Sequence, residues 1–421
     1  MKASAPASIP PPLRSTGEDF GLFGRLLLKQ FAKITQGRLI LEFSGCEHVF
    51  GSSQASTTIN ITVLNPVFFR KACLGGSLGV ADSYSAGDWE TNDLVGLFRL
   101  FLQNFEVMDD LEGGWASLLN KLARWGYMIG QKNTVKGSRR NIALHYDLGN
   151  NFYELMLDPT MTYSCGIFAD KETTLEQASI AKYDRIIEQL DIKEGQTVLE
   201  IGCGWGGFAQ RLLETTGAKW TGTTISKEQH SYTLRQIEKG GFKERATLLQ
   251  EDYRTLQGSY DRVVSIEMIE AVGHEYLPTY FSKISHLLAA DGAALVQAIT
   301  MPDHRYDQYL TEVVYIRTRV FPGSCVPSVS AMISAVAKKS DLRPTGVQDI
   351  GYHYARTLRE WRLRFLKNEE AIKSLGYDDS FRRAWIYYLC YCEAGFEEGY
   401  TGDIHLLLTK PNCKVGKGFT Q

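Results

Sequence analysis

Residues 198–207 read VLEIGCGWGG, and this stretch decides the fold of the chain. An apolar run ends at the acid Glu200 and passes into three alternate glycines, Gly202, Gly204 and Gly206. A buried parallel strand that leaves its sheet through such a turn lets the backbone approach a bound nucleoside closely. The spacing differs from the dinucleotide fingerprint, which needs two non-glycine positions before its last glycine.

Strands and helices alternate along the chain around this turn. Helical spacing marks 208–216 and 227–239, and short apolar runs lie on either side of them. The alternation predicts an α/β fold with a doubly wound, mostly parallel sheet, which binds ligands beyond the carboxyl ends of its strands. The expected strands are 197–202, 219–225, 246–252, 261–267 and 293–299, with a late strand at 403–410.

The stretch 303–392 interrupts this alternation. It is long and rich in Tyr, Trp and Phe, as in AWIYYLCYCEAGF at 384–396. We expect a helical insertion that covers the active site, with its aromatic side chains mostly packed in the core. The larger domain then runs from 142 to 410, and a short tail follows at 411–421.

A smaller α+β domain is expected at 18–130. Helical spacing at 18–36 is followed by a β pattern from 37 to 89 and by a second helical segment at 93–105. The first residues, 1–17, are rich in Pro, Ser and Ala, which predicts disorder. The chain therefore divides into an amino-terminal accessory domain and a larger α/β domain.

Two basic segments are candidates for contact with anionic lipid. The segment 131–141 is polar and basic, and it is interpreted as a linker between the domains. In the helix at 18–36, Arg25, Lys29 and Lys33 lie between apolar residues. Packing in the core is favoured for this helix over a position on a bilayer surface.

Composition excludes several classes of function. The net charge of −2 provides no basic field for nucleic acid. The eight cysteines show no CxxC spacing, so we predict no metal site. The start MKASAPASIPPP lacks the apolar core of a signal peptide, and no apolar run reaches the roughly 18 residues of a membrane span. We expect a cytoplasmic protein, peripheral to the inner face of the membrane.

Seven further motifs occur in a fixed order around VLEIGCGWGG. They are HYDLGNNFYELMLD (145–158), MTYSCGIF (161–168), TGTTISKEQ (221–229), DYRTL (252–256), SIEMIEAVG (265–273), FPGSCVPS (321–328) and GYHYARTLREW (351–361). Together they resemble the cyclopropane-fatty-acyl-phospholipid synthase family over essentially 37–410. That family belongs to the class I methyltransferases that use S-adenosylmethionine, so the resemblance implies this Rossmann-like fold and this co-substrate.

The resemblance also implies which residues bind the methyl donor. Glu200 is expected to orient the first loop rather than touch the ligand. Ser226 has a competing structural role, because it is a good N-cap for the helix that begins at Lys227. The implied donor-binding residues are Tyr163, Ser164, Gly202, Cys203, Gly204, Thr224, Ile225, Ser226, Gln229, Asp252 and Tyr253.

The acceptor chemistry needs a dry pocket and a base. An isolated cis double bond is a poor nucleophile and attacks a sulfonium methyl only when the two are aligned without water. Aromatic faces stabilise the resulting carbocation, and a base then removes a proton so that the ring closes. The resemblance implies a bound bicarbonate as this base. Its expected ligands are Cys165, Glu270, Tyr354, Gln297 and the backbone of Ile299.

The sequence departs from the family pattern beside this base. Gln297 stands where the bacterial synthases have a histidine, and Ala271 stands where another histidine is frequent. A glutamine donates a hydrogen bond to an anion but brings no titratable charge. Glu267 is a competing carboxylate, and a lone cysteine such as Cys165 is by default an apolar core thiol.

These features predict a transferase that acts on lipid. The implied reaction adds the methyl carbon of S-adenosylmethionine to the cis double bond of an unsaturated phospholipid acyl chain and forms a cyclopropane. The departures leave a methylene- or methyl-branched product open, and a saturated branch requires a partner reductase. A methyltransferase for a small nucleophilic acceptor and a lipid-binding protein with a vestigial donor site are further alternatives.

The expected partners follow from this reaction. The substrate is a membrane phospholipid with a cis-unsaturated acyl chain, reached by peripheral membrane contact through the basic linker and the adjacent helices. The family resemblance implies that the amino-terminal domain assists lipid engagement and contact between the subunits of a homodimer. Nucleic acid is not an expected partner.

Overall fold

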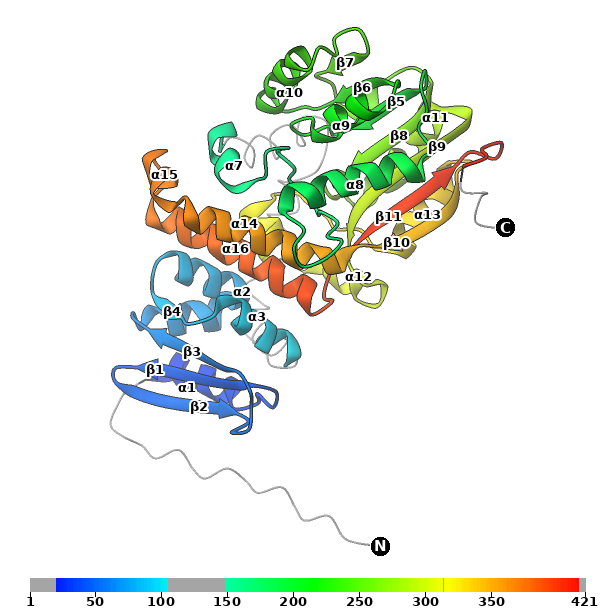
Figure 1. Cartoon of the computed structure of the whole chain (residues 1–421). Coiled ribbons are helices and arrows are strands. Elements are labelled where there is room, and N and C mark those ends of the chain that lie inside the picture. Colours follow the sequence, from blue (N-terminus) through cyan, green and yellow to red (C-terminus); the bar gives the residue numbers. More distant parts are fainter. Residues whose placement is uncertain (1–19, 105–147, 313, 416–421) are drawn as a thin grey trace, which may run out of the picture.

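A small sheet and a large sheet lie at opposite ends of the molecule, with long helices between them (Figure 1). The structure is a computed structural model that describes residues 20–104, 148–312 and 314–415. The predicted tail 1–17, the linker 131–141 and the first residues of the HYDLGN motif fall outside the described residues. No helix in the described part of the chain is long and apolar enough to cross a membrane.

The small sheet has four strands in the order β2-β1-β3-β4. β1 pairs in parallel with β3, and the other neighbours are antiparallel. The alternation expected at Ile59, Ile61 and Val63 is confirmed, because all three side chains are buried on one face. The strands are β1 (Arg38–Phe43), β2 (Cys46–Gly51), β3 (Thr58–Val63) and β4 (Trp89–Thr91).

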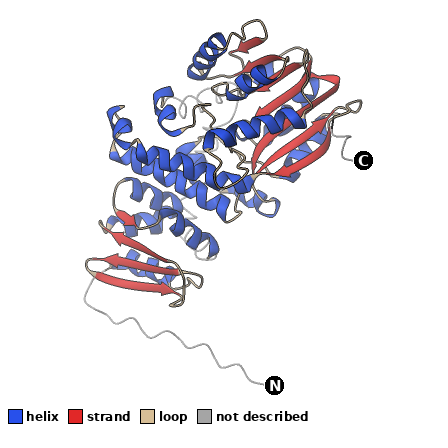
Figure 2. Ribbon diagram, viewed as in Figure 1, coloured by secondary structure: helices blue, strands red, loops and turns tan. Residues whose placement is uncertain are grey.

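Helices α1 (Gly21–Phe31), α2 (Val67–Ser85) and α3 (Leu94–Gln103) complete the amino-terminal part. The helices predicted at 18–36 and 93–105 are confirmed, but the β pattern expected to continue to 89 is wrong over α2. Glycines are poor helix formers, and α2 is kinked at Gly76, so its helical signal is weak. Figure 2 shows these helices packed beside the small sheet.

The large sheet has seven strands in the order β10-β11-β9-β8-β5-β6-β7. Its five central and distal strands are parallel, and β11 is antiparallel to β9, as predicted. All five predicted parallel strands and the late strand are confirmed. They are β5 (Thr197–Ile201), β6 (Lys219–Thr223), β7 (Ala246–Leu249), β8 (Tyr260–Ile266), β9 (Leu288–Thr300) and β11 (Gly402–Thr409).

Helices cover both faces of this sheet, as a doubly wound fold requires. The crossover helices place the loops after β5, β6 and β7 at one edge of the sheet, whereas Tyr163 and Ser164 come from the segment between α7 and α8. The helices before and between the strands are α7 (Asn150–Met156), α8 (Leu175–Gln189), α9 (Gly207–Thr215), α10 (Lys227–Lys239) and α11 (Leu277–Leu287).

The expected helical insertion at 303–392 contains a strand, so that prediction is wrong at β10 (Arg343–Asp349). β10 lies at the sheet edge and carries Pro344, and most of its residues are exposed, so no alternation marks it as a strand. The helices of this segment are α12 (Asp303–Thr311), α13 (Val329–Lys339), α14 (Tyr354–Lys367), α15 (Glu369–Ser374) and α16 (Asp379–Glu397).

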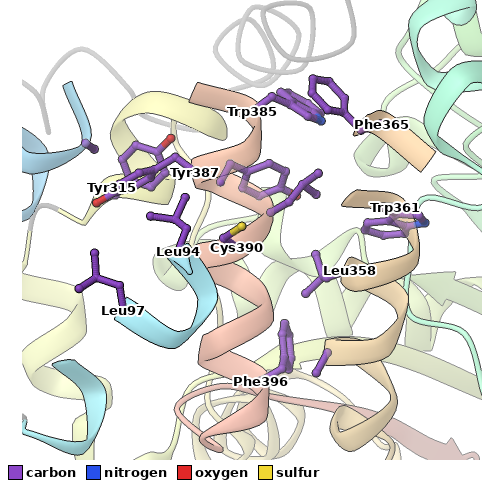
Figure 3. Packing of buried hydrophobic residues seen from close by; sticks show 14 of the residues in the cluster. Leu94, Leu97, Tyr315, Leu358, Trp361, Phe365, Trp385, Tyr387, Cys390 and Phe396 are labelled. Carbon is purple, nitrogen blue, oxygen red and sulfur yellow. The ribbon is translucent and has the colours of Figure 1, made fainter. Parts of the chain in front are cut away.

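One continuous core joins the amino-terminal helices to α14 and α16. The Tyr387 ring on α16 lies 4.9 Å from the Phe98 ring on α3 and 5.5 Å from the Tyr84 ring on α2. Figure 3 shows Cys390 of α16 between Leu94 of α3 and Trp361 of α14, with Tyr387 beside Tyr315. The small sheet and its helices are therefore fixed to the larger domain through shared aromatic packing.

Candidate active site

The glycine turn after β5 is shaped by close contacts on one side and open space on the other. Gly202 has a φ of 81°, and a Cβ there would lie 2.7 Å from Cγ of Met268, so only glycine fits. A Cβ at Gly204 would meet no atom within 4 Å. Both features follow from a turn that crosses the end of the sheet and leaves room for a ligand.

A cavity of about 390 Å³ opens beside this turn. It extends from the carboxyl ends of the parallel strands to the aromatic faces of α14 and α16. Most of the residues expected to bind the donor lie around it, although they come from separate loops. Those that line the cavity are Tyr163, Ser164, Gly202, Cys203, Gly204, Thr224, Ile225, Gln229, Asp252 and Tyr253.

Ser226 is the expected donor residue that lies outside this lining. Its Oγ accepts a hydrogen bond from the Gln229 backbone N–H at 3.3 Å, so it caps the start of α10. Beside it, Thr224 Oγ1 donates to Gln229 Oε1 at 2.8 Å and fixes the amide at the cavity wall. The structure thus supports the structural role that competed with donor binding at Ser226.

Asp252 forms an ion pair with the residue two positions after it. Its Oδ2 lies 2.7 Å from Nη2 of Arg254, and its Oδ1 also accepts from the Arg254 backbone N–H at 3.0 Å. Both side chains line the cavity. Asp252 is therefore held in one orientation. An adenine amino group that donates to Asp252 has to share the carboxylate oxygens with the Arg254 guanidinium.

The donor site fits S-adenosylmethionine. The open face of Gly204 admits the backbone approach that a nucleoside needs, and the Gln229 amide and the Asp252 carboxylate provide polar groups around it. Glu200 also borders the cavity, where its Oε2 accepts from Trp220 Nε1 at 2.9 Å. Burial raises the pKa of Glu200 to about 8, and the Trp220 hydrogen bond holds the carboxyl in place.

Glu267 accepts hydrogen bonds from several of the residues that were expected to bind a bicarbonate base. Its Oε1 accepts from the Cys165 backbone N–H at 2.8 Å and from Gln297 Nε2 at 2.8 Å. Its Oε2 accepts from the Tyr354 hydroxyl at 2.5 Å. Burial raises the pKa of Glu267, whereas the charge of Lys182 and the hydrogen bonds with Tyr354, the Cys165 backbone and Asp403 lower it.

Glu270, the carboxylate favoured from the sequence, lies in the same cavity with different contacts. Its Oε1 accepts from the Ile299 backbone N–H at 2.6 Å. Its Oε2 is buried and has no hydrogen-bond partner among the described residues. Burial, followed by the nearby charge of Glu267, raises the pKa of Glu270 to about 8, so the carboxyl is largely protonated at neutral pH.

The thiol of Cys165 faces away from the cavity. Its Sγ lies 3.3 Å from the Gly166 carbonyl oxygen and 3.8 Å from that of Ile350. Burial raises its pKa well above the usual range, so the thiol stays neutral. The residue contributes its backbone N–H to Glu267, and its side chain behaves as the apolar core thiol that was the competing interpretation.

Two buried charged residues of this cluster were missed in the sequence. Asp403 on β11 accepts from Gln297 Nε2 at 2.8 Å, and burial raises its pKa well above the usual range. Lys182 on α8 is fully buried, and its Nζ donates to Ser164 Oγ. Their surroundings in sequence are an ordinary strand and an ordinary helix, so no local pattern pointed to them.

Aromatic side chains form an apolar wall of the same cavity. The Tyr163 and Tyr388 hydroxyls lie 3.0 Å apart, and the Tyr354 ring stacks on Phe396 with centroids 4.3 Å apart. Phe321, from the FPG motif, also borders the cavity and lies 6.0 Å from the Tyr388 ring. This wall suits an apolar chain, and its ring faces can stabilise a cation.

The chain is similar in sequence to enzymes of known activity. The sequence profile described as mycolic acid cyclopropane synthetase matches residues 133–406. Tuberculostearic acid methyltransferase UfaA1 of Mycobacterium tuberculosis is 36% identical over 332 residues, which cover 77% of each chain. Cyclopropane-fatty-acyl-phospholipid synthase of Escherichia coli is 34% identical over 349 residues, which cover 81% of this chain and 85% of that one.

The fold is similar to a solved structure in the same group. The mycolic acid cyclopropane synthase CmaA1, crystallised with SAH and CTAB, matches with a TM-score of 0.61 and 31% sequence identity. The match covers 65% of this chain and 98% of that protein. The amino-terminal part of this chain contributes a second sheet and helices beyond the shared larger domain.

Proposed function

This chain belongs to the mycolic acid cyclopropane synthetase family, and from that premise we propose its acceptor and product. It is an S-adenosylmethionine-dependent methyltransferase with the class I fold, as expected. We propose that it transfers the methyl carbon to the cis double bond of an unsaturated phospholipid acyl chain and forms a cyclopropane. The relative from Escherichia coli, a cyclopropane-fatty-acyl-phospholipid synthase, supports this choice.

The observation that carries the proposal is one cavity that joins three kinds of surface. The open turn at Gly204, the aromatic rings of Tyr163 and Phe321, and Glu270 all line this one cavity. A double bond against that wall would be shielded from water and within the same space as a sulfonium methyl. A small polar acceptor would gain little from a wall of this kind.

The residues of this chain perform distinct parts of the reaction. The glycine turn and the Gln229 amide orient the methyl donor, which supplies an electrophilic methyl group when bound. The rings of Tyr163 and Phe321 exclude water and offer their faces to the carbocation on the acyl chain. A base at this cluster of buried carboxyl groups then accepts the proton that the cation loses.

A methylene- or methyl-branched product is a second candidate. Gln297 replaces the histidine of the bacterial pattern, and its amide is committed to two carboxylates. The similarity to a tuberculostearic acid methyltransferase supports the same alternative. For such a product, the carbocation undergoes a hydride shift before deprotonation or loses a proton other than one of the added methyl group. A saturated branch then needs a separate reductase.

We also propose that the enzyme meets its substrate at a membrane surface through α1. Leu22 and Leu26 lie one helical turn apart on α1, with 70% and 47% of their surface exposed. Arg25 and Lys29 are exposed on the same helix. Two apolar side chains beside cations suit a surface of anionic phospholipid. Leu27 and Leu28 are buried, in agreement with the expected packing of the opposite face.

Product analysis tests the proposed reaction. Purified protein is incubated with methyl-labelled S-adenosylmethionine and liposomes of cis-monounsaturated phospholipid. The fatty esters are then examined before and after mild hydrogenation. A labelled product that resists hydrogenation supports the cyclopropane, and one that becomes a methyl-branched chain supports the second candidate. Turnover only on soluble amines or phenols would contradict both.

The Gln297→His variant addresses the second candidate. If Gln297 steers proton loss, the variant moves the product ratio toward cyclopropane. An unchanged ratio would remove Gln297 as the determinant of the product.

A further inference from the structure

The donors expected around a bicarbonate are already occupied by protein carboxylates. Three of them, the Cys165 backbone N–H, the Gln297 amide and the Tyr354 hydroxyl, donate to Glu267 at 2.8, 2.8 and 2.5 Å. The remaining donor, the Ile299 backbone N–H, lies 2.6 Å from Glu270 Oε1. A carboxylate has the same planar pair of oxygens as bicarbonate, so the Glu267 side chain satisfies these groups in its place.

The charge of the site disfavours a further anion. Glu267, Glu270 and Asp403 are all buried at this end of the cavity, and each acts electrostatically on another of the three. Lys182 is the buried cation that favours the ionised form of Glu267 and Asp403. A bicarbonate would have to enter beside these carboxylates, and the four residues expected to donate to it already donate to Glu267 and Glu270, so the described residues do not fit it.

The backbone at Glu267 is held in a conformation that aims its side chain inward. Its φ is 46°, in the left-handed region, which costs a non-glycine residue about 1 kcal/mol or more. Its N–H donates to the Gln297 carbonyl oxygen at 3.0 Å, directly after β8 ends at Ile266. Local strain of this kind persists where the surrounding structure holds it, and such positions cluster at functional sites.

We propose that Glu267 is the catalytic base of this enzyme and replaces the bicarbonate expected from the family resemblance. The inference rests on the proposed function. The π electrons of the double bond form the new bond to the methyl carbon, and the electrons of the broken carbon–sulfur bond stay on sulfur. A proton of the added methyl group passes to Glu267, and the electrons of that carbon–hydrogen bond close the ring. The carboxyl returns its proton to water after product release.

The geometry leaves Glu267 able to accept this proton. Its Oε2 accepts from the Tyr354 hydroxyl, and its carboxyl also interacts with Asp403, but a carboxylate has about four acceptor sites and keeps capacity for a proton. Glu267 itself lines the cavity, as does Tyr354. Burial raises the pKa of Tyr354 well above its usual range, so the phenol remains a neutral donor to the carboxylate. The same contacts hold the base in a single orientation.

The dependence of turnover on added bicarbonate shows whether Glu267 or a bound bicarbonate accepts the proton. Wild-type enzyme, Glu267→Gly, Glu267→Gln and the exposed control Glu275→Gln are assayed in carbon-dioxide-free buffer, with and without added bicarbonate. We expect wild type and the control to change less than twofold. Glu267→Gly should lose at least a hundredfold in turnover and regain at least tenfold with bicarbonate, because glycine tolerates this φ and leaves room for the anion. Glu267→Gln should lose as much and show no rescue, since its amide fills the space.

Two results of the turnover assay would overturn the proposal: a wild-type enzyme that loses turnover when bicarbonate is removed, or a Glu267→Gln variant with at least half of wild-type turnover. Binding of ¹³C-labelled bicarbonate, followed by NMR, gives a readout that does not need turnover. We expect binding to Glu267→Gly and none to wild type. If the wild-type enzyme does not methylate lipid under any condition, the proposed function fails, and the binding result still decides whether Glu267 or bicarbonate occupies the site. Binding to wild type would contradict the inference.

Discussion

The Gln297 amide nitrogen lies between two carboxylates, 2.8 Å from Glu267 Oε1 and 2.8 Å from Asp403 Oδ2. Gln297 is on β9, Asp403 is on the neighbouring antiparallel strand β11, and Glu267 follows β8. The NH₂ group can donate one hydrogen to each acid. It therefore links two buried acids that would otherwise repel each other.

Replacing this amide with an apolar side chain of similar size should raise the pKa of the carboxylate pair. In Gln297→Leu, Glu267 and Asp403 each lose a hydrogen bond that stabilises the ionised carboxylate, so their ionisation becomes less favourable. Activity needs an ionised base, so the acid limb of the pH–rate profile should move to higher pH. We also expect a loss of about 1–3 kcal/mol in the free energy of unfolding. A profile that does not move would show that the amide does not tune the base.

The Glu270 carboxyl predicts a stability effect with a definite sign. Burial, followed by the charge of Glu267, raises the pKa of this carboxyl in the folded protein to about 8 from its ordinary value of 4.5. The stabilising effect of the neutral form is complete below pH 4.5, and it is lost as pH rises through 8, because ionisation then occurs in a buried site. Glu270→Gln stays neutral at every pH. The variant should therefore match wild type near pH 4.5 and exceed it in stability above pH 8.

Thermal unfolding across this range measures the difference between the two proteins. We expect the gap in the free energy of unfolding to grow to a few kcal/mol between pH 5 and pH 9, on the order implied by the shift. Other titrating groups are common to both proteins and cancel in the comparison. A gap that stays constant with pH would contradict the raised pKa of Glu270.

The position of the Cys165 side chain predicts that the enzyme keeps its turnover when the thiol is removed, whereas a catalytic thiol would predict a large loss. The base is contacted by the backbone N–H of Cys165, and the thiol faces Ile350. Cys165→Ala keeps that N–H and removes one buried sulfur, so turnover should stay within about fivefold of wild type. Tyr354→Phe removes the hydroxyl that donates to Glu267, and it should lower turnover by roughly 10- to 100-fold. Equal losses in the two variants would assign a direct role to the thiol.

The fold followed from local signals wherever a segment is buried on both faces or amphipathic. The run VLEI before the glycine turn is buried throughout β5, so its apolar character was unambiguous. β10 gave no such signal, because an edge strand with mostly exposed residues shows neither a continuous apolar run nor alternation. α2 was missed because its glycines reduce helix propensity and its core contacts involve only part of its surface.

The donor loops were predictable because each motif follows a predicted strand, and the ends of parallel strands meet at one edge. In contrast, the sequence could not show which of Glu267 and Glu270 acts as the base. Both lie in SIEMIEAVG, and their roles depend on contacts with distant residues such as Tyr354, 87 positions away in sequence from Glu267. Lys182 and Asp403 were hidden for the same reason, since only tertiary packing brings them beside the carboxylates.

The exposed face of α1 predicts a measurable contribution to membrane binding. Leu22→Ser combined with Leu26→Ser removes two apolar side chains that would enter the lipid interface. At about 1 kcal/mol or more for each, their loss should weaken binding to anionic liposomes by roughly tenfold or more. Leu234→Ser on α10 is the matched control, because Leu234 is 42% exposed and α10 lies far from α1 (Figure 1). Liposome flotation measures the bound fraction of each protein.

Two further measurements distinguish membrane binding through α1 from a general loss of activity: the dependence of binding on salt, and the kinetics with substrate in liposomes or in detergent. Binding of wild type should fall as salt rises, because the cations of α1 act on anionic headgroups over distances that salt screens. With liposomes, the double variant should show a higher apparent KM and an unchanged kcat, since no residue of α1 lines the active-site cavity. With detergent-dispersed substrate, both constants should equal those of wild type. Unchanged flotation of the double variant, or an equal defect in Leu234→Ser, would place the membrane contact on another surface.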